Sequence, residues 1–213
     1  MNEAPYNPLD RHNLGASVAE AMLERLPLPL GAVPRAEGAG VYAIYYTGDF
    51  PLYEPIAAAN RDDQWRWPIY VGKAIPAGGR KGAKPTDKET RPLVSRLKEH
   101  AGSIRAVENL NIDDFFCRYL VVEDIWIPLG ESLLIAKFSP IWNQMMDGFG
   151  NHAPGKGRHE GMRPRWDVIH PGRKAFDKLQ PRIETAETIS SEIGAYLRMA
   201  PVPPIRPRML LDH

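Results

Sequence analysis

The chain has 213 residues and a mass of 23.9 kDa, which suits one compact domain with elaborations and a sizeable core. Its 27 Lys and Arg nearly balance 26 Asp and Glu, and charged residues at 25% with hydrophobic ones at 43% exclude an intrinsically disordered chain. No apolar run reaches the ~18–20 residues of a membrane span, and no secretory signal pattern opens the chain, so we expect a cytoplasmic protein without a membrane partner. The lone Cys117 excludes an internal disulfide and a thiolate metal cage.

The periodicity of apolar residues predicts the elements. In the first helix they recur at every fourth position, with Asn13 as the predicted N-cap. The strands are rich in aromatic and β-branched residues, and proline limits the helix before Pro140. In chain order, we predict a helix over 14–26, strands over 40–46 and 68–74, a helix over 91–104, a strand over 115–124, and helices over 128–138 and 184–199.

The formal net charge of +1 argues against a nucleic-acid partner only if the charge is evenly spread, and it is not. Residues 70–91 hold six basic and two acidic side chains, and residues 150–182 hold eight basic and three acidic ones. Residues 106–135, in contrast, hold one basic and six acidic side chains. The two basic segments are rich in Gly and Pro, which favours loops that suit a phosphate backbone, although solvated surface loops explain them equally well.

Arg96 and His100 lie four residues apart in the predicted helix 91–104, so they share one face beside its apolar stripe. An arginine neutralises the charge of a phosphate and a histidine holds or transfers a proton, so the pair suits phosphoryl chemistry. An ordinary solvated helix face, with Lys98 and Glu99 alongside, explains the same pattern.

Glu131 falls on an apolar helix face, because Leu134, Ile135 and Phe138 follow it on that face. A carboxylate withdrawn from water is unfavourable unless it is paired, and a hard divalent cation with several waters would supply a partner. Alternatively, the acid occupies the first helical turn, where the helix dipole stabilises it by about 0.3–1 kcal/mol.

Four further residues gain meaning only in combination. Tyr42 and Tyr70 lie in the two predicted strands, where aromatic residues are usually core or cross-strand residues. Lys73 stands at the end of the second strand, and Asn143 follows the buried helix, where its amide can hold either a backbone turn or a site side chain. No P-loop, GxGxxG, HExxH or CxxC pattern occurs, so nucleotide hydrolysis by those routes and structural zinc lack support.

Together these positions resemble the catalytic core of the GIY-YIG nuclease family. The family's elements appear, in order, as Gly40-Val41-Tyr42, Tyr70-Val71-Gly72, the R-x3-H step Arg96 and His100, the metal-binding Glu131 and the closing Asn143. The chain is most similar to the type II restriction endonucleases of this family that cut CCGCGG. Its tyrosines are 28 residues apart and Gly72 precedes Arg96 by 24, so each interval holds an insertion relative to compact members.

The resemblance implies an α+β fold, with a small mixed or antiparallel sheet of about three strands flanked by helices, N- and C-terminal helical additions, and long loops. We expect a single GIY-YIG endonuclease domain over 1–213. Its parts are a catalytic core at about 38–145, an N-terminal helical arm at 1–37 and DNA-recognition and dimerisation elements at 146–213.

The implied activity is hydrolysis of DNA phosphodiester bonds at a short palindromic GC-rich site with one Mg²⁺, for which Mn²⁺ can substitute. Glu131 would bind the metal and Arg96 would counter charge on the phosphoryl oxygens. Tyr42 would orient or deprotonate the attacking water, helped by His100 or Lys73, with Tyr70 at the phosphate and Asn143 bracing the site. Because a phenol has a pKa of about 10, Tyr42 needs a nearby cation to act as a base near neutrality.

We expect specificity to come from the basic loops, which would contact double-stranded DNA. A palindromic target implies a homodimer, to which the N-terminal arm contributes, in a prokaryotic restriction–modification system. The alternatives are a repair or structure-selective nuclease of the same family, a catalytically inactive DNA-binding module, and, with less support, an RNA-binding protein. The predicted DNA-binding residues are Arg80, Lys81, Lys84, Lys156, Arg158, Arg163, Arg165 and Arg173.

Overall fold

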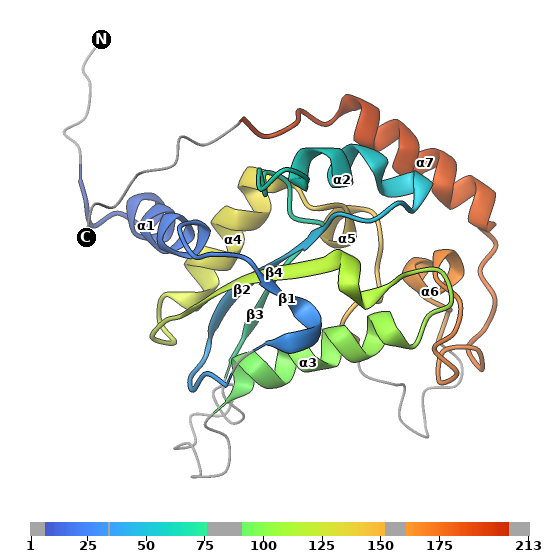
Figure 1. Ribbon diagram of the computed structural model, residues 1–213, viewed down its shortest axis with the longest axis horizontal. Helices are drawn as coiled ribbons and strands as arrows, with labels where there is room; N and C mark the ends of the chain where they lie inside the picture. The colour runs from blue at the N-terminus through green and yellow to red at the C-terminus, as the bar shows by residue number, and fades with distance from the viewer. Residues whose placement is uncertain (1–6, 34, 76–90, 152–160, 205–213) are drawn as a thin grey trace.

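A computed structural model describes residues 7–33, 35–75, 91–151 and 161–204 (Figure 1). Its centre is an antiparallel sheet with the strand order β1-β4-β2-β3. The strands are β1 (Leu28–Pro29), β2 (Gly40–Tyr46), β3 (Tyr70–Ala74) and β4 (Phe115–Val121). The helices are α1 (Arg11–Leu23), α2 (Glu54–Asn60), α3 (Pro92–Arg105), α4 (Ile127–Phe138), α5 (Ile141–Gln144), α6 (Arg165–Ile169) and α7 (Ala186–Met199).

The α+β fold with helices around a small antiparallel sheet is confirmed, but the sheet has four strands rather than about three. The additional strand is the two-residue β1, in which Leu28 and Pro29 pair with Cys117 and Phe116 of β4. Proline is tolerated at this position because β1 is an edge strand. Its Pro-rich surroundings gave no alternating pattern from which to predict a strand.

Strand β2 is buried on both faces, so its alternate side chains enter two separate cores. Val41, Ala43 and Tyr45 pack with residues of α1 and α4, while Tyr42 and Ile44 pack on the opposite face with residues of α3, α5, α6 and α7. Figure 1 shows this arrangement, with α1 and α4 on one side and α3 across the sheet from them.

Helix α1 begins three residues earlier than predicted. Asp10, not Asn13, is its N-cap, and the carboxylate Oδ1 of Asp10 accepts a hydrogen bond from the backbone N–H of Asn13 at 2.9 Å. The helix packs against α4, where a Cβ on Gly15 would lie 2.5 Å from a methyl carbon of Leu133. Helix α1 of the N-terminal segment is therefore packed tightly on α4.

The C-terminal part of the chain also joins the main core. Ile189, Ile193 and Leu197 of α7 are buried in the same cluster as Tyr42, and the hydroxyl of Tyr196 donates to the carbonyl oxygen of Ser139 at 3.0 Å. The catalytic core predicted at about 38–145 is therefore packed against elements from both sides of it in the sequence.

Candidate active site

The two motif tyrosines lie on one face of the sheet at the junction of β2 and β3. Tyr42 pairs with Gly72 and Ile44 with Tyr70, so the tyrosine rings are neighbours, with centroids 6.2 Å apart. A Cβ on Gly72 would lie 2.5 Å from the hydroxyl oxygen of Tyr42. Glycine is therefore required opposite Tyr42, because any side chain at position 72 on this face would displace the phenol ring.

Helix α3 places His100 directly against Tyr42. The Tyr42 hydroxyl and His100 Nε2 are 2.6 Å apart, and the His100 ring centroid lies 5.1 Å from that of Tyr70. His100 is fully buried, which rules out the solvated helix face for this residue. Arg96, one turn earlier, is partly exposed and pairs with the carboxylate of Glu99 at 2.9 Å.

Burial sets the protonation of the Tyr42–His100 pair. It raises the pKa of Tyr42 well above the ordinary value, an effect to which Tyr70 adds and which Arg96 opposes. It lowers the pKa of His100 to about 3, with Arg96 and Arg173 contributing in the same direction. At neutral pH the pair therefore consists of a protonated phenol and a neutral imidazole, whose other nitrogen, Nδ1, has no hydrogen-bond partner among the described residues.

The second pair of the site, Lys73 and Glu131, is charged and lies on the other face of β3. Lys73 pairs with Val41, so its side chain points toward α4, where its ammonium donates to Glu131 Oε2 at 2.5 Å. The side chains of Lys73 and Glu131 are 33% and 18% exposed, so both charges are reachable from the surface. The negative charge of Glu131 also helps to raise the pKa of Tyr42 and of Tyr70, which places the two halves of the site within electrostatic range.

The structure excludes one of the two explanations of Glu131, its placement in the first helical turn. The residue lies in the second turn of α4, which begins at Ile127, so first-turn stabilisation by the helix dipole does not apply. Its i+3 and i+7 neighbours, Leu134 and Phe138, are buried as predicted. The carboxylate is thus held at the edge of an apolar face and is stabilised by the charge of Lys73.

Asn143 braces the edge of β3 from the outside of the sheet. Its side-chain oxygen accepts a hydrogen bond from the backbone N–H of Val71, and its amide nitrogen donates to the carbonyl oxygen of Val71, both at 2.8 Å. The adjacent backbone N–H of Trp142 donates to the carbonyl oxygen of Ile69 at 3.0 Å. Asn143 thereby substitutes for a further strand and holds Tyr70, Gly72 and Lys73 in register.

The donor set at Glu131 fits a hard divalent cation bound through a single protein ligand. Within the described ranges, no three His, Cys, Asp or Glu side chains gather around one point, which argues against an all-protein cage. Mg²⁺ commonly binds through one or two carboxylates together with waters and a substrate phosphate. A partly exposed carboxylate that is paired, among the described residues, with one lysine ammonium meets that requirement.

Two of the arginines predicted to bind DNA have other partners. Arg173 is buried and pairs with Asp167 at 2.6 Å, and its guanidinium stacks over Trp166 and Phe176. Arg165, 18% exposed, is paired with Glu184 and Glu192, both at 2.7 Å. Burial and the Asp167 pair oppose DNA contact by Arg173, and the two ion pairs oppose it for Arg165.

Arg163 is the remaining predicted DNA-binding residue within the described ranges. One of its guanidinium nitrogens donates to the carbonyl oxygen of Asp177 at 2.9 Å, and it stays partly exposed. The other predicted DNA-binding residues, Arg80, Lys81, Lys84, Lys156 and Arg158, lie outside the described residues.

Sequence reasoning missed the residues that enclose His100. Phe149 stacks on the His100 ring with centroids 4.6 Å apart and an interplanar angle of 18°. Gly150 follows it, and a Cβ there would lie 2.5 Å from Cε1 of His100. The signal in the sequence is a glycine on each side of a phenylalanine, Gly148-Phe149-Gly150.

The geometry defines a GIY-YIG nuclease: two paired strands carry the tyrosines, one helix carries Arg and His, a second helix carries Glu, and an asparagine closes the strand edge. The chain matches the family model of the Eco29kI GIY-YIG domain over residues 34–197 and belongs to that family of restriction endonucleases. It is therefore a restriction-type nuclease whose substrate is DNA. No curated protein matches the chain closely enough to be considered a relative.

The family match extends well beyond the predicted core of about 38–145 and reaches into α7. This agrees with the packing of α6 and α7 on the main core. Across the described part of the chain, no helix combines the length and the apolar character that a membrane crossing requires.

Proposed function

We propose that the protein is a type II restriction endonuclease that uses one Mg²⁺ to hydrolyse DNA at a short palindromic GC-rich site, CCGCGG by resemblance. The observation that supports this most strongly is the placement of two complementary pairs around one strand. Tyr42 and His100 lie on one face of β3, and Lys73 and Glu131 lie on the other.

The Tyr42–His100 contact favours His100 over Lys73 as the partner of the phenol. At neutral pH the imidazole is unprotonated, so it can accept the Tyr42 proton while Tyr42 takes one from the attacking water. Lys73 is instead bonded to Glu131 across the strand. The water oxygen forms a bond to phosphorus and the bond from phosphorus to the 3′ oxygen breaks. The proton lost by the water ends on His100 through Tyr42, and the 3′ oxygen takes up a proton from solvent.

Arg96 would act at the phosphate and indirectly on the base. In the free protein its positive charge depresses the pKa of His100. When a DNA phosphate pairs with Arg96, the phosphate offsets that charge, and the pKa of His100 rises toward the range in which it accepts a proton. Substrate binding would therefore strengthen the proton acceptor, and Tyr70 would help to hold the same phosphate.

Glu131 is the residue that would hold the metal, which supplies Lewis-acid polarisation of the phosphate and stabilises the leaving oxygen. For DNA recognition, we propose contacts from Arg163 and from the predicted residues outside the described ranges, Arg80, Lys81, Lys84, Lys156 and Arg158. A palindromic target requires two equivalent active sites, so we propose a homodimer on DNA.

The test is digestion of a plasmid with a single CCGCGG site beside a matched plasmid in which that site is altered. We expect cleavage of the first plasmid alone, with Mg²⁺ or Mn²⁺ and not with EDTA. Glu131→Gln should reduce the cleavage rate by at least about 10²-fold, whereas Glu108→Gln, which alters an exposed carboxylate outside the site, should cut normally. Full activity of Glu131→Gln would refute the metal assignment.

The alternatives give different outcomes in the same assay. Cleavage that prefers branched or damaged duplexes over the plasmid site would indicate a repair or structure-selective nuclease. A sequence-specific gel shift without metal-dependent cleavage would indicate an inactive DNA-binding module. Light scattering of Glu131→Gln on a target duplex should give two chains per duplex, and one chain per duplex would contradict the homodimer.

A further inference from the structure

The His100 ring is enclosed by aromatic side chains, and among the described residues its hydrogen bond is to Tyr42. Phe149 stacks nearly parallel on its face at 4.6 Å, while Tyr42 and Tyr70 meet it at centroid distances of 5.4 and 5.1 Å. Phe149 also contacts Tyr70 edge-on at 4.9 Å. Since a flat stack restricts rotation of the imidazole, Phe149 fixes the plane in which Nε2 meets the Tyr42 hydroxyl.

The backbone around Phe149 is shaped for this contact. Gly148 and Gly150 have φ values of +100° and +77°, a region that favours glycine. A Cβ on Gly150 would lie 2.5 Å from Cε1 of His100 and 3.0 Å from a guanidinium nitrogen of Arg96. The backbone of the turn 148–150 therefore packs closely against His100 and lies within contact distance of Arg96.

The turn is anchored by the buried ion pair between Arg173 and Asp167. The guanidinium of Arg173 donates to both carboxylate oxygens of Asp167, at 2.6 and 2.7 Å, and also to the carbonyl oxygen of Gly148 at 3.1 Å. The two side chains are 6% and 4% exposed. Such a pair is a geometric constraint more than a source of stability, because desolvation offsets much of its attraction.

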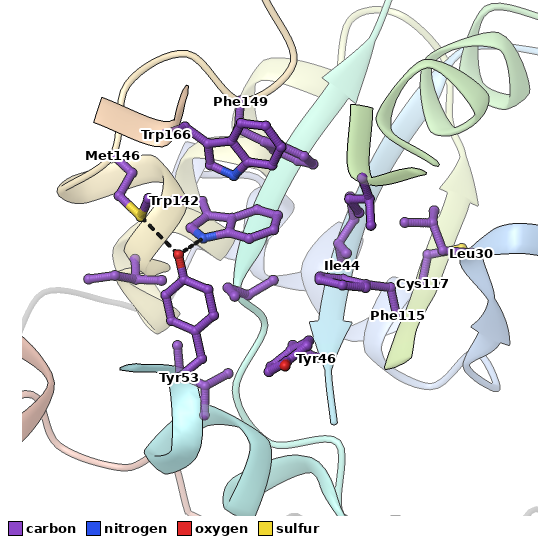
Figure 2. Close-up of a cluster of buried hydrophobic side chains, with 14 of the residues drawn as sticks. Leu30, Ile44, Tyr46, Tyr53, Phe115, Cys117, Trp142, Met146, Phe149 and Trp166 are labelled. Atoms are coloured by element: carbon purple, nitrogen blue, oxygen red, sulfur yellow. Dashed lines mark hydrogen bonds between the residues drawn. The ribbon is translucent and has the colours of Figure 1, made fainter. Parts of the chain in front are cut away.

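Aromatic packing completes the support from the other side. Phe149 lies 4.3 Å from Trp142 and 5.3 Å from Trp166, centroid to centroid. Figure 2 shows these rings together, with Tyr53 bonded to Trp142 beneath them. Trp142 directly precedes Asn143 in α5. The same aromatic cluster therefore includes a residue next to Asn143 and the Phe149 ring that stacks on His100.

We propose that Phe149 is a positioning residue of the nuclease site, which acts through His100 and is itself held in place by the Arg173–Asp167 pair. The proposal rests on the proposed function, because it assigns Phe149 a role in the proton transfer between Tyr42 and His100. Under this proposal, the basic segment 150–182 supports the active site through Arg173 in addition to any contact with DNA.

The test compares three variants in steady-state cleavage over a range of DNA concentrations, well below their melting temperatures. Phe149→Leu keeps apolar volume but removes the flat ring, and Phe149→Tyr keeps the ring. Phe115→Leu is the matched control, because Phe115 is a buried phenylalanine in the same cluster that packs on Tyr46 and Trp142. All three change core packing, and Phe149 alone stacks on His100 among the described residues.

We expect Phe149→Leu to lower kcat roughly 10- to 100-fold, as misplacement of a reacting group does, with KM for DNA little changed. Phe149→Tyr should restore most of kcat, and Phe115→Leu should keep it within about threefold, a change too small to reflect lost positioning. Nitrogen-15 spectra should show the His100 ring in one neutral tautomer in the wild type and in a mixture in Phe149→Leu. If Phe149→Leu does not fold, Arg173→Lys should show the same decrease in kcat. This variant keeps the positive charge but loses the guanidinium nitrogen that donates to the Gly148 carbonyl oxygen.

The failures of the two proposals are separable. A wild-type protein that cuts no DNA would refute the proposed function. A wild type that cuts, with Phe149→Leu equal to Phe115→Leu in kcat, would overturn the role of Phe149 and leave the proposed function standing. Loss of kcat in Phe149→Leu that Phe149→Tyr does not rescue would also overturn it.

Discussion

Substitution of Asn143 by alanine tests how the edge of β3 is held. The change removes the hydrogen bond from the Val71 N–H and the one to the Val71 carbonyl oxygen, both 2.8 Å long. Val71 is buried, so water cannot readily replace either partner. Each polar group left unpaired costs about 1–3 kcal/mol, which gives roughly 2–6 kcal/mol for the two.

That loss is measurable by thermal unfolding. For a chain of this size, each kcal/mol lowers Tm by about 2–4 °C, so we expect a decrease of about 10 °C. Asn143→Asp retains the acceptor for the Val71 N–H but sets a carboxylate oxygen against the Val71 carbonyl, so it should be at least as unstable. Gln144→Ala is the control, because Gln144 is the exposed amide next to Asn143 in α5.

Activity should fall more than stability alone requires. Tyr70 and Gly72 flank Val71, and Lys73 lies two residues beyond it, so relaxation at this position displaces both halves of the site. Cleavage by Asn143→Ala should be at least 10²-fold slower at a temperature where the variant remains folded, as expected for a displacement of about 1 Å. A variant with a Tm within 1–2 °C of the wild type, less than the shift from 1 kcal/mol, and with normal cleavage would refute the bracing role.

Two further predictions follow from buried groups. The pKa values of His100 and His170 are both lowered to about 3 by burial, so between pH 6.5 and 3 the unfolded chain binds protons that the folded chain does not. The free energy of unfolding should thus fall on acidification, by roughly 2 kcal/mol per histidine from pH 7 to 5. Denaturant unfolding at several pH values should show a weaker pH dependence in His170→Gln than in the wild type. An unchanged pH dependence would contradict the lowered pKa of His170. Gly72→Ala should displace the Tyr42 ring and abolish cleavage. The control Gly102→Ala, in open space on α3, should cut normally. Equal cleavage by both variants would contradict the requirement for glycine at position 72.

Much of the fold was predictable because its signals are local. Strand β2 was predicted at its observed bounds, and α4 to within one residue, because their composition and limits are unambiguous. Helices α5 and α6, with four and five residues, escaped prediction because such short helices depend on tertiary contacts rather than propensity. The start of α1 was misjudged because Asp10 and Asn13 are both good capping residues and only the observed hydrogen bond separates them.

The site residues that belong to the family motif could be predicted from the sequence. The residues that enclose them through tertiary contacts could not. His100 shares its helix with Lys98 and Glu99, so a sequence pattern cannot reveal that it is fully enclosed. The enclosure depends on Phe149, which lies 49 residues away in the chain and reaches His100 through a turn held by Arg173. No periodicity connects those positions, because the contact is tertiary.

The same reasoning changes the meaning of the positive charge in residues 150–182. Arg165, Arg173 and Arg182 all pair with carboxylates, so their charges are largely neutralised within the protein. A count of charges along the sequence cannot detect this, because two partners of these arginines, Glu184 and Glu192, lie outside the counted segment. Arginine is the side chain suited to both tasks, since its fork binds a carboxylate as readily as a phosphate. The contribution of this segment to cleavage is therefore best sought in how it holds the turn at Phe149, and its contribution to DNA binding in Arg163 and its neighbours.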